Sequence, residues 1–579
     1  MLKLSVLAVS CALLALTGCK PAPAPVTVRL VHGGEAEAWL EAQARTFEAT
    51  GMRTKSNRPI RVEVTVMDAS EAIPAVLGGS LKPHVFNPAS STDVSRLEQA
   101  WRAGPGQGKP LLASHESVLR SPLVLAMPRV AAEALGWPEK PLGWDALLRV
   151  AESAEGWASF GHPEWGAFKL AHAHAEASSA GLLGVWAVLS AGARQPGGEP
   201  GDLRGEAARD FLGRVEAAVP HYAPSPRFFV ERMREHGPEY LSAVVAFAHQ
   251  VEASSAREGA PFPLVAVSSP EAPLPVADLP YAILAAPWVA PEESEAARVF
   301  LDFLLAPPAQ DAAVARGFRR ALVGKAARPA LGLPDAAQVE DVLAAWRAKK
   351  KNPSVVVVLD QSARMAGKPL EEARAGFQVL LDALRGPQPE VSLFTFGQEV
   401  AHEVGPFPVE GEGRRLLTQP VAEGHASGKA ALYDGVAAGY DVARARARAP
   451  SSARSTFGVI VLTAGRDEGS SGPLPRLVKH LRGEPPEAPP PPPPLPPSAT
   501  PEERERREKM EALVASLPEA PPEVMRELRG PGVPVFLVTY GEGVDTQAVA
   551  ELAKATRGQA LPVAPETQAR VLRQVAAFF

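Results

Sequence analysis

The hydrophobic pattern is clearest at residues 355–359, where five apolar residues follow one another without a break. Four of the five are β-branched valines, and the run ends abruptly at Asp360. Such a run predicts a strand that is buried on both faces of a parallel sheet. Ligands bind at the carboxyl ends of the strands in sheets of this kind. The loop that begins at Asp360 is therefore a candidate functional site.

Strand-like and helix-like segments alternate along the C-terminal half of the chain. We expect helices at 369–384, 545–556 and 566–579, and further strands at 391–397, 457–465 and 533–541. Regular alternation of this kind predicts a parallel sheet with helices on both faces, a doubly wound Rossmann-like α/β arrangement.

The N-terminal half alternates in the same way. Strands at 26–32, 61–67 and 84–86 are each followed by a helix, which predicts a first α/β lobe. A strand at 121–128 leaves that lobe, and residues from about 130 to 275 predict a second α/β lobe. We expect the two-lobed part to span 27–335, a polar connecting helix to lie within 336–352, and the C-terminal domain to span 353–579.

Composition agrees with several globular units. The chain has 579 residues, which is too long for one hydrophobic core. Hydrophobic residues make up 46% and charged residues 22%, and the net charge of -5 argues against a nucleic-acid partner. The 60 prolines predict long loops and a linker.

The first residues have the pattern of a secretory signal. Lys3 precedes an apolar run at 4–16 that is too short to span a membrane. The run ends in Leu-Thr-Gly-Cys, which resembles a bacterial lipobox. The resemblance implies a signal peptide at 1–18, lipidation of Cys19 and a membrane-anchored tether at 19–26. The alternative is an ordinary signal peptide with a chance cysteine.

The residues around this anchor bear on stability and location. Cys11 and Cys19 are the two cysteines of the chain, so the exported protein has no internal disulfide. Residue 20 is Lys rather than Asp. By analogy with lipoprotein sorting, this gives a slight preference for the outer membrane, with the protein on its periplasmic or extracellular face.

Two passages of the N-terminal half resemble bacterial extracellular solute-binding proteins of the molybdate, sulfate and iron type. One is the pair of helices at 295–305 and 307–318, the second ending in Gly-Phe, and the other runs from Gly161 to Leu182. The similarity covers roughly residues 27–330. It implies a two-lobed periplasmic-binding-protein fold with a ligand clamped between the lobes.

The ligand of such a fold would lie between loops that begin helices, because free N–H groups there suit an oxyanion. The candidate contacts are the hydroxyls of Ser90, Ser91 and Thr92 on the first lobe and of Ser178 and Ser179 on the second. The alternative is that these hydroxyls only cap helices. Glu35 beside the first strand disfavours an anion, which leaves a neutral ligand, a cationic ligand or no ligand open.

The loop after the central strand resembles the metal-ion-dependent adhesion site of von Willebrand factor A domains, which begins Asp-x-Ser-x-Ser. Asp360 and Ser362 match this pattern, but Arg364 replaces the second Ser, Ala430 the Thr and Ala464 the later Asp. Three of five oxygen ligands are therefore missing, and a hard cation needs a shell of oxygens. We expect a degenerate site without metal, in which Arg364 occupies the cation's place and pairs with Asp360.

Two further features predict little chemistry. The insertion at 483–521 contains a proline run at 489–497, which is either a stiff spacer or a docking segment for a partner.

His172 and His174 are spaced like a metal pair, but no other ligand lies at suitable spacing nearby, so we expect an ordinary loop. No cofactor is expected.

We therefore expect a non-enzymatic, membrane-anchored binding lipoprotein. Its solute-binding module would take a small molecule, and its A domain would contact a protein partner. The alternative is a scaffold or adhesin without a small-molecule ligand. An enzyme is the third choice, because the chain has no Gly-x-Ser-x-Gly, Walker-type or His-Glu-x-x-His motif and no cysteine nucleophile.

Overall fold

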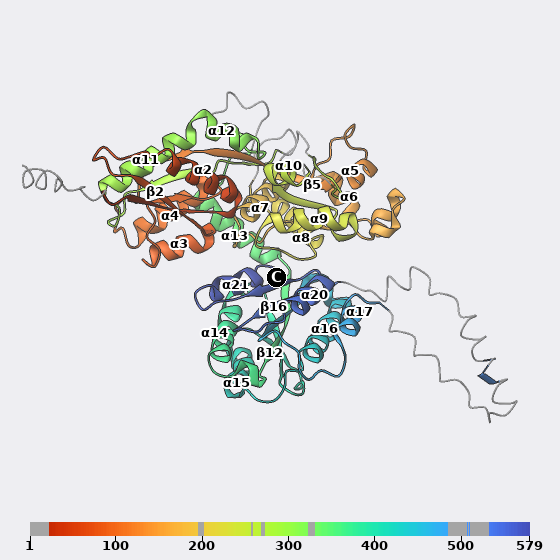
Figure 1. Ribbon diagram of the computed structural model, residues 1–579. Coiled ribbons are helices and arrows are strands. Elements are labelled where there is room, and N and C mark those ends of the chain that lie inside the picture. Colours follow the sequence, from red (N-terminus) through yellow and green to blue (C-terminus); the bar gives the residue numbers. More distant parts are fainter. Residues whose placement is uncertain are drawn as a thin grey trace, which may run out of the picture.

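Three mixed α/β units, each built on its own sheet, make up the computed structural model of the chain (Figure 1). The structure describes residues 23–194, 202–255, 259–267, 273–321, 331–484, 506–507, 509 and 532–579. The predicted signal peptide, Cys19 and most of the insertion at 483–521 lie outside these residues.

Lobe 1 is a five-stranded sheet with the order β2-β1-β3-β10-β4. Its strands are β1 (Val26–His32), β2 (Ile60–Val66), β3 (Val85–Asn87), β4 (Leu112–Ser117) and β10 (Pro280–Leu284). Its helices are α2 (Glu37–Ala49), α3 (Ala69–Leu77), α4 (Ser91–Ala103), α11 (Pro291–Leu305) and α12 (Pro307–Val314). β10 runs antiparallel to β3 and β4, so a late segment of the chain completes the first lobe.

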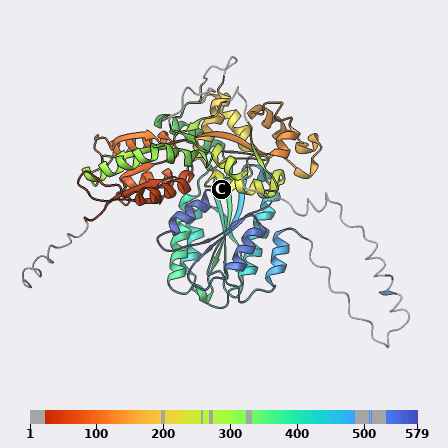
Figure 2. The same ribbon diagram turned by 45° about the horizontal axis from the view of Figure 1, so that its top comes forward.

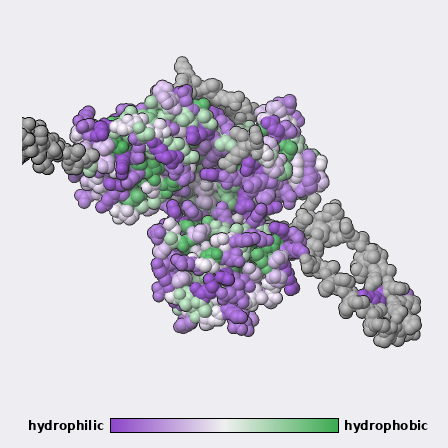
Figure 3. Space-filling model, viewed as in Figure 1, coloured by the Kyte–Doolittle hydropathy of each residue, from purple (hydrophilic) through white to green (hydrophobic). Residues whose placement is uncertain are grey.

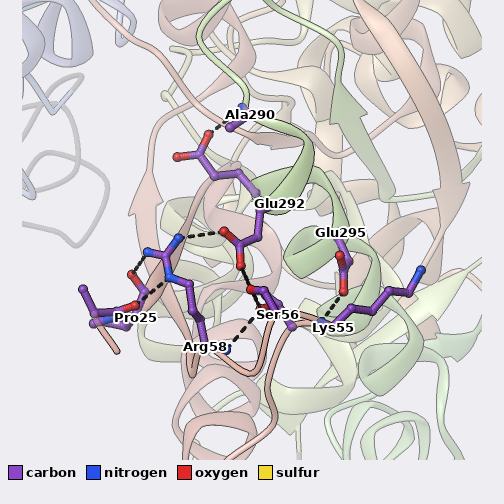
Figure 4. Close-up of polar contacts among 10 residues, drawn as sticks. Pro25, Lys55, Ser56, Arg58, Ala290, Glu292 and Glu295 are labelled. Atoms are coloured by element: carbon purple, nitrogen blue, oxygen red, sulfur yellow. Dashed lines mark hydrogen bonds and ion pairs between the residues drawn. The ribbon is translucent and has the colours of Figure 1, made fainter. Parts of the chain in front are cut away.

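Polar contacts fasten that late segment to the early one. The Arg58 guanidinium pairs with the Glu292 carboxylate at 2.7 Å (Figure 4). The Thr54 hydroxyl donates to the same carboxylate at 2.9 Å. The amide of Lys55 donates to Glu295 at 2.7 Å. These bonds hold the loop before β2 against the first turn of α11.

Lobe 2 is built around β5 (Leu119–Pro128), which pairs with β7 (Ala243–Phe247), β8 (Leu264–Val267), β9 (Val276–Ala277) and β11 (Arg319–Arg320). β6 (Leu170–Ala171) pairs with β7. Its helices are α5 (Arg129–Ala134), α6 (Trp144–Ala151), α7 (Ser179–Gly192), α8 (Glu206–Ala217), α9 (Pro226–Tyr240) and α10 (Ala248–Ser255). α7 is apolar all round and buried over most of its length, as expected of a helix inside a core.

The C-terminal unit is a six-stranded sheet with the order β14-β13-β12-β15-β16-β17. Its strands are β12 (Asn352–Asp360), β13 (Glu390–Phe396), β14 (Val404–Pro408), β15 (Ser455–Thr463), β16 (Val535–Thr539) and β17 (Gln559–Pro562). Its helices are α14 (Lys368–Ala383), α15 (Gly411–Glu423), α16 (Leu432–Arg448), α17 (Leu474–Leu481), α20 (Thr546–Ala555) and α21 (Gln568–Ala576). The doubly wound prediction is confirmed, with one difference: the edge strand β14 is antiparallel.

The connector is helix α13 (Ala336–Lys349), which packs against α4 of lobe 1 and against α7 and α8 of lobe 2 before the chain enters β12. The C-terminal unit lies beneath the junction of the two lobes, with α21 nearest to them and α15 farthest away (Figures 1 and 2). Hydrophilic residues, interspersed with hydrophobic ones, cover the visible faces away from that junction (Figure 3).

Lobe 2 and the C-terminal unit share one hydrophobic core, to which α9 contributes Phe229 and Met233 and the last residues contribute Phe578. The rings of Phe228 and Phe578 lie 4.9 Å apart, and the Tyr222 amide donates to the Phe578 carbonyl at 3.1 Å. The C-terminal unit is therefore packed on lobe 2. Among the described residues, no helix has the length and apolar character that crossing a membrane requires.

Candidate functional site

The N-termini of α4 and α7 face each other across the two lobes. Ser90 precedes α4 and Ser178 precedes α7, each with extended backbone, as residues that start a helix have. The Ser179 hydroxyl donates to Asp93 Oδ2 at 2.5 Å. This bond joins lobe 2 to lobe 1 directly, and it brings together the two groups of candidate residues.

Protein atoms already accept hydrogen bonds from most of the candidate hydroxyls. The Ser90 hydroxyl donates to Asp93 Oδ2 at 3.5 Å, and the Thr92 hydroxyl donates to the Pro334 carbonyl at 2.8 Å. At Ser91 the backbone amide, rather than the hydroxyl, is held, by Asp278 Oδ1 at 2.8 Å. Ser178 is buried and forms no side-chain cap bond. Hydroxyls held in this way are less available to an anion than free ones.

Three carboxyl groups gather at the same place. Burial raises the pKa of Glu35 to about 7, and the nearby Asp93 carboxylate adds to the shift. Burial also raises the pKa of Asp68 well above its usual value, with Glu35, Glu71 and Asp93 contributing. Burial raises the pKa of Asp93 as well, although Arg96 and the Ser179 hydroxyl oppose the shift. Carboxyl groups held close together in this way suit a cationic group better than an oxyanion.

Asp68 and Asp93 were not among the residues proposed from sequence. Asp93 stands three residues after Ser90 in the first turn of α4, and an acidic residue there is ordinarily interpreted as a partner of the helix dipole. Asp68 directly precedes α3 and makes no side-chain cap bond. Their convergence with Glu35 depends on packing between separate elements, which local patterns do not carry.

Open space begins next to Asp68, one of these three residues. A cavity of about 410 Å³ is lined by the start of α3 in lobe 1, by the segment before α7 in lobe 2, and by α14 and α21 of the C-terminal unit. The C-terminal unit thus forms a wall of the space onto which the two lobes open.

His172, one of the two histidines of the expected loop, belongs to a structural network. His172 Nε2 lies 2.8 Å from Glu216 Oε1, and the Tyr222 hydroxyl donates to Glu216 Oε2 at 2.6 Å. The buried Glu216 carboxylate raises the pKa of His172 against the opposing effect of burial. Within the described ranges, no group of three or more His, Cys, Asp or Glu residues could hold a metal ion.

The second candidate site lies at the carboxyl end of β12. Asp360 is fully buried and accepts hydrogen bonds from the Ser362 amide at 2.8 Å, the Thr463 hydroxyl at 2.7 Å and the Ala464 amide at 3.2 Å. The Asp360 carboxylate therefore ties the loop after β12 to the loop after β15.

The pairing expected for Arg364 is wrong. Its guanidinium pairs with Glu468 at 3.1 Å rather than with Asp360, because Asp360 is buried among amide and hydroxyl donors while Arg364 reaches outward. The carbonyl of Ala430 accepts from the amides of Glu468 and Gly469 at 2.8 and 3.0 Å. Glu468 lies four residues beyond Ala464, and no motif marks it in the sequence.

This donor set does not fit a hard divalent cation. The hydroxyl of Ser362 is buried and has no hydrogen-bond partner within the described structure, so one oxygen is free. The oxygens of Asp360 are occupied by three donors, and Ala430 and Ala464 offer no side-chain oxygen. A cation of this kind takes about six oxygen ligands, so the loops hold together through hydrogen bonds and one ion pair instead.

Comparisons with solved structures found neighbours of low sequence identity and low TM-score. A periplasmic binding protein, AfuA from Actinobacillus pleuropneumoniae, is 12% identical with a TM-score of 0.39 and matches 55% of this chain and 97% of its own. A von Willebrand factor type A protein from Catenulispora acidiphila is 15% identical with a TM-score of 0.25 and matches 39% of this chain and 42% of its own. The C-terminal unit is called the A domain below, a label taken only from the resemblance of its Asp-x-Ser loop to that of von Willebrand factor A domains.

Sequence comparisons identify relatives and a family. An uncharacterized protein of Mycobacterium tuberculosis is 26% identical over an alignment 429 residues long, and the alignment covers 69% of this chain. The chain spans 59% of the length of that relative. The profile of bacterial extracellular solute-binding proteins matches residues 28–319, about half of the chain and nearly all of both lobes. The chain therefore belongs to the bacterial extracellular solute-binding protein family.

Proposed function

We propose that this protein is a non-enzymatic, membrane-anchored binding lipoprotein. Its two lobes bind a small solute in the cleft between them, and its A domain contacts a protein partner. The observation that carries the first part is the meeting of α4 and α7 at the Asp93–Ser179 hydrogen bond. The Ser70 hydroxyl also donates to the Ala177 carbonyl at 3.3 Å, so polar contacts between the starts of helices join the two lobes where a clamped ligand would lie.

The solute carries a positive charge at the end that enters the cleft. Burial raises the pKa of all three carboxyl groups, and neighbouring carboxylates add to the shifts of Glu35 and Asp68. Asp93 pairs with Arg96 at 3.1 Å, so Glu35 and Asp68 are the groups that a ligand cation would compensate. A ligand ammonium would relieve both the desolvation and the mutual repulsion. Among the ligands that the sequence leaves open, this proposal selects a cationic one.

Thermal unfolding tests the binding function. The purified protein is heated with a panel of amines, amino acids, sugars, oxyanions and divalent metals. A ligand at a hundredfold excess over its dissociation constant stabilises the folded state by about 2.7 kcal/mol. We expect an amine-bearing class to stabilise the protein, and Asp93→Asn to abolish that stabilisation.

A scaffold or adhesin without a solute is the alternative function. It is favoured by the protein acceptors that already bind the hydroxyls of Ser90, Thr92 and Ser179. No stabilisation by any class in the panel would select this alternative.

Membrane anchoring through Cys19, with a slight preference for the outer membrane, is a separate proposal from the Leu-Thr-Gly-Cys pattern. Metabolic labelling with palmitate should mark the wild-type protein but not the Cys19→Ser variant.

The proposal that the A domain contacts a partner is supported by its orientation. The chain enters β12 at Asn352, next to lobe 2, and Asp360 lies at the opposite end of that strand. The face that carries Asp360 and the Arg364–Glu468 pair therefore points away from the lobes, and we propose that it contacts a partner without a metal ion.

A further inference from the structure

The cavity of about 410 Å³ next to Asp68 has walls from all three units. Lobe 1 contributes Asp68 and Glu71 from the start of α3. Lobe 2 contributes His174, and the A domain contributes Arg385 after α14 and Arg573 on α21. A volume of this size is within the range of small-molecule sites and is large enough for an amino acid or a dipeptide.

Opposite charges stand on opposite walls of this cavity. Asp68 and Glu71 lie on the lobe 1 side and Arg385 and Arg573 on the A-domain side. Burial raises the pKa of Glu71, and the positive charge of Arg573 opposes that shift, so the two side chains interact across the space. The walls thus separate one negative and one positive region.

Two other carboxylates of the wall already have protein partners. Glu176 pairs with Arg347 at 2.5 Å, and Asp382 pairs with Arg414 at 2.7 Å. Within the described part of the chain, no ion pair shorter than 4 Å holds Arg385 or Arg573. These two guanidinium groups are therefore the cations that the cavity offers to an anionic group of a ligand.

His174 adds an uncharged hydrogen-bonding group. Its side chain is 6% exposed, and its Nδ1 has no hydrogen-bond partner within the described structure, while its Nε2 lies 3.3 Å from Lys350 Nζ. Burial and the Lys350 charge lower the pKa of His174 well below its usual value, so the ring is neutral. A buried polar atom without a partner is costly, and a ligand polar group in the cavity would satisfy it.

We propose that this cavity is the outer part of the solute site and that its ligand is a small zwitterion, a free amino acid or a dipeptide. The ammonium group faces Asp68 and Glu71, and the carboxylate faces Arg385 and Arg573. This inference rests on the proposed solute-binding function and adds two points to it: the chemical class of the ligand and the participation of the A domain in its site.

The arrangement couples ligand binding to the A domain. The A domain is packed on lobe 2, whereas lobe 1 meets it across the cavity through the charges of Glu71 and Arg573. A zwitterion bound there fastens lobe 1 to both other units at once. The A domain therefore contacts the bound ligand directly, through Arg385 and Arg573.

Calorimetric titration of the purified protein with the twenty L-amino acids and glycyl dipeptides tests this assignment. We expect at least one of them to bind, and Arg385→Ala and Arg573→Ala each to weaken that binding by about tenfold or more. Arg415→Ala is the control, because Arg415 lies on α15, pairs with Glu412 and does not line the cavity, and it should leave the affinity within about twofold. Thermal unfolding without ligand verifies that each variant is folded.

The amine that corresponds to the bound amino acid but lacks its carboxylate provides a second measurement. It should bind the wild-type protein about tenfold more weakly, and Arg573→Ala should not weaken it further. Amino-acid binding that is unchanged in Arg385→Ala and Arg573→Ala overturns the role of the A domain. Binding of simple amines but of no amino acid or dipeptide overturns the zwitterion and leaves the solute-binding function in place. Failure of every amino acid, dipeptide and amine to bind overturns the zwitterion, and the thermal-unfolding panel of sugars, oxyanions and metals then decides the solute-binding function.

Discussion

Lys350, which follows the connector helix, donates a hydrogen bond of 2.7 Å from its ammonium group to the carbonyl oxygen of Arg385 in the A domain. Its nitrogen also lies 4.9 Å from the ring centroid of Trp346 and 5.3 Å from that of Tyr222. The side chain is 3% exposed, and this burial lowers the pKa of Lys350 to about 8, with Glu176 and Glu216 opposing the shift. A titratable group thus lies in the joint between lobe 2 and the A domain.

Replacing Lys350 by Met should remove a pH dependence of stability. A lysine whose pKa is lower in the folded than in the unfolded state disfavours folding while it is protonated, and this penalty disappears as the pH rises from about 8 to about 10.4. Over that range the free energy of unfolding of the wild type should rise by about 3 kcal/mol relative to Lys350→Met. Urea denaturation at several pH values measures the difference.

Lys349→Met is the control for this substitution. Lys349 pairs with Asp210 at 3.5 Å on the half-exposed side of the same helix. Its variant should follow the wild-type pH profile. A Lys350→Met profile that runs parallel to the wild type would show that Lys350 does not titrate in this range.

Glu35 should make the free energy of unfolding fall as the pH rises, the opposite of the effect of Lys350, and it should do so at lower pH. Its pKa is raised to about 7, so the folded state holds the proton more tightly than the unfolded state does. The stability that this group contributes is fully present below about pH 4.3 and is lost as the pH rises to about 7. Glu35→Gln keeps the neutral form, so its variant should be more stable than the wild type at pH 8 and similar to it at pH 4. The same change at Glu37, in the first turn of α2, controls for the loss of one carboxylate.

The sequence predicted the two folds because they depend on periodicity. The apolar run at 355–359 became the central strand β12, and the alternation around it became the doubly wound sheet. The strand β14 was missed, since Val404–Pro408 contains two prolines and is only half-buried at an edge. Prediction from periodicity fails where a strand buries neither face.

The candidate sites were predicted less completely than the folds. The helix N-termini at Ser90 and Ser178 do meet, and the hydroxyl of Ser179 reaches across the lobes. What the sequence did not contain is the identity of the group on the other side, Asp93, because that contact joins residues 86 positions apart. The sequence likewise did not identify Glu468, which pairs with Arg364 in place of the expected Asp360. Helix starts are local signals, whereas charge pairing depends on three-dimensional packing.

Replacing Asp360 by Ala should destabilise the A domain, and the loss of stability should be the same with and without divalent metal ions. The substitution leaves the Ser362 amide, the Thr463 hydroxyl and the Ala464 amide without their buried acceptor. Each unsatisfied donor costs about 1–3 kcal/mol, so the free energy of unfolding should fall by about 3 kcal/mol or more. Arg364→Ala removes only a partly exposed ion pair and should cost at most about 1 kcal/mol. Mg²⁺ or Ca²⁺ should leave both midpoints unchanged, and a tight isotherm that Asp360→Ala abolishes would contradict the metal-free site.

Replacing Phe578 by Ala should loosen the A domain from lobe 2. The Phe578 ring lies 4.9 Å from that of Phe228 in lobe 2 and 4.6 Å from that of Phe536 in β16, and it is 2% exposed. Loss of a buried phenylalanine costs about 3–5 kcal/mol, and here much of that cost falls on the contact between the units. We expect a larger radius of gyration by small-angle X-ray scattering and faster proteolysis near residues 350–352. Phe160→Ala, at a side chain that is 40% exposed on lobe 2, should change neither the radius of gyration nor the rate of proteolysis.

The A domain also lines the cavity, so Phe578→Ala should weaken ligand binding as Arg573→Ala does. An unchanged affinity would show that the ligand contacts the lobes alone.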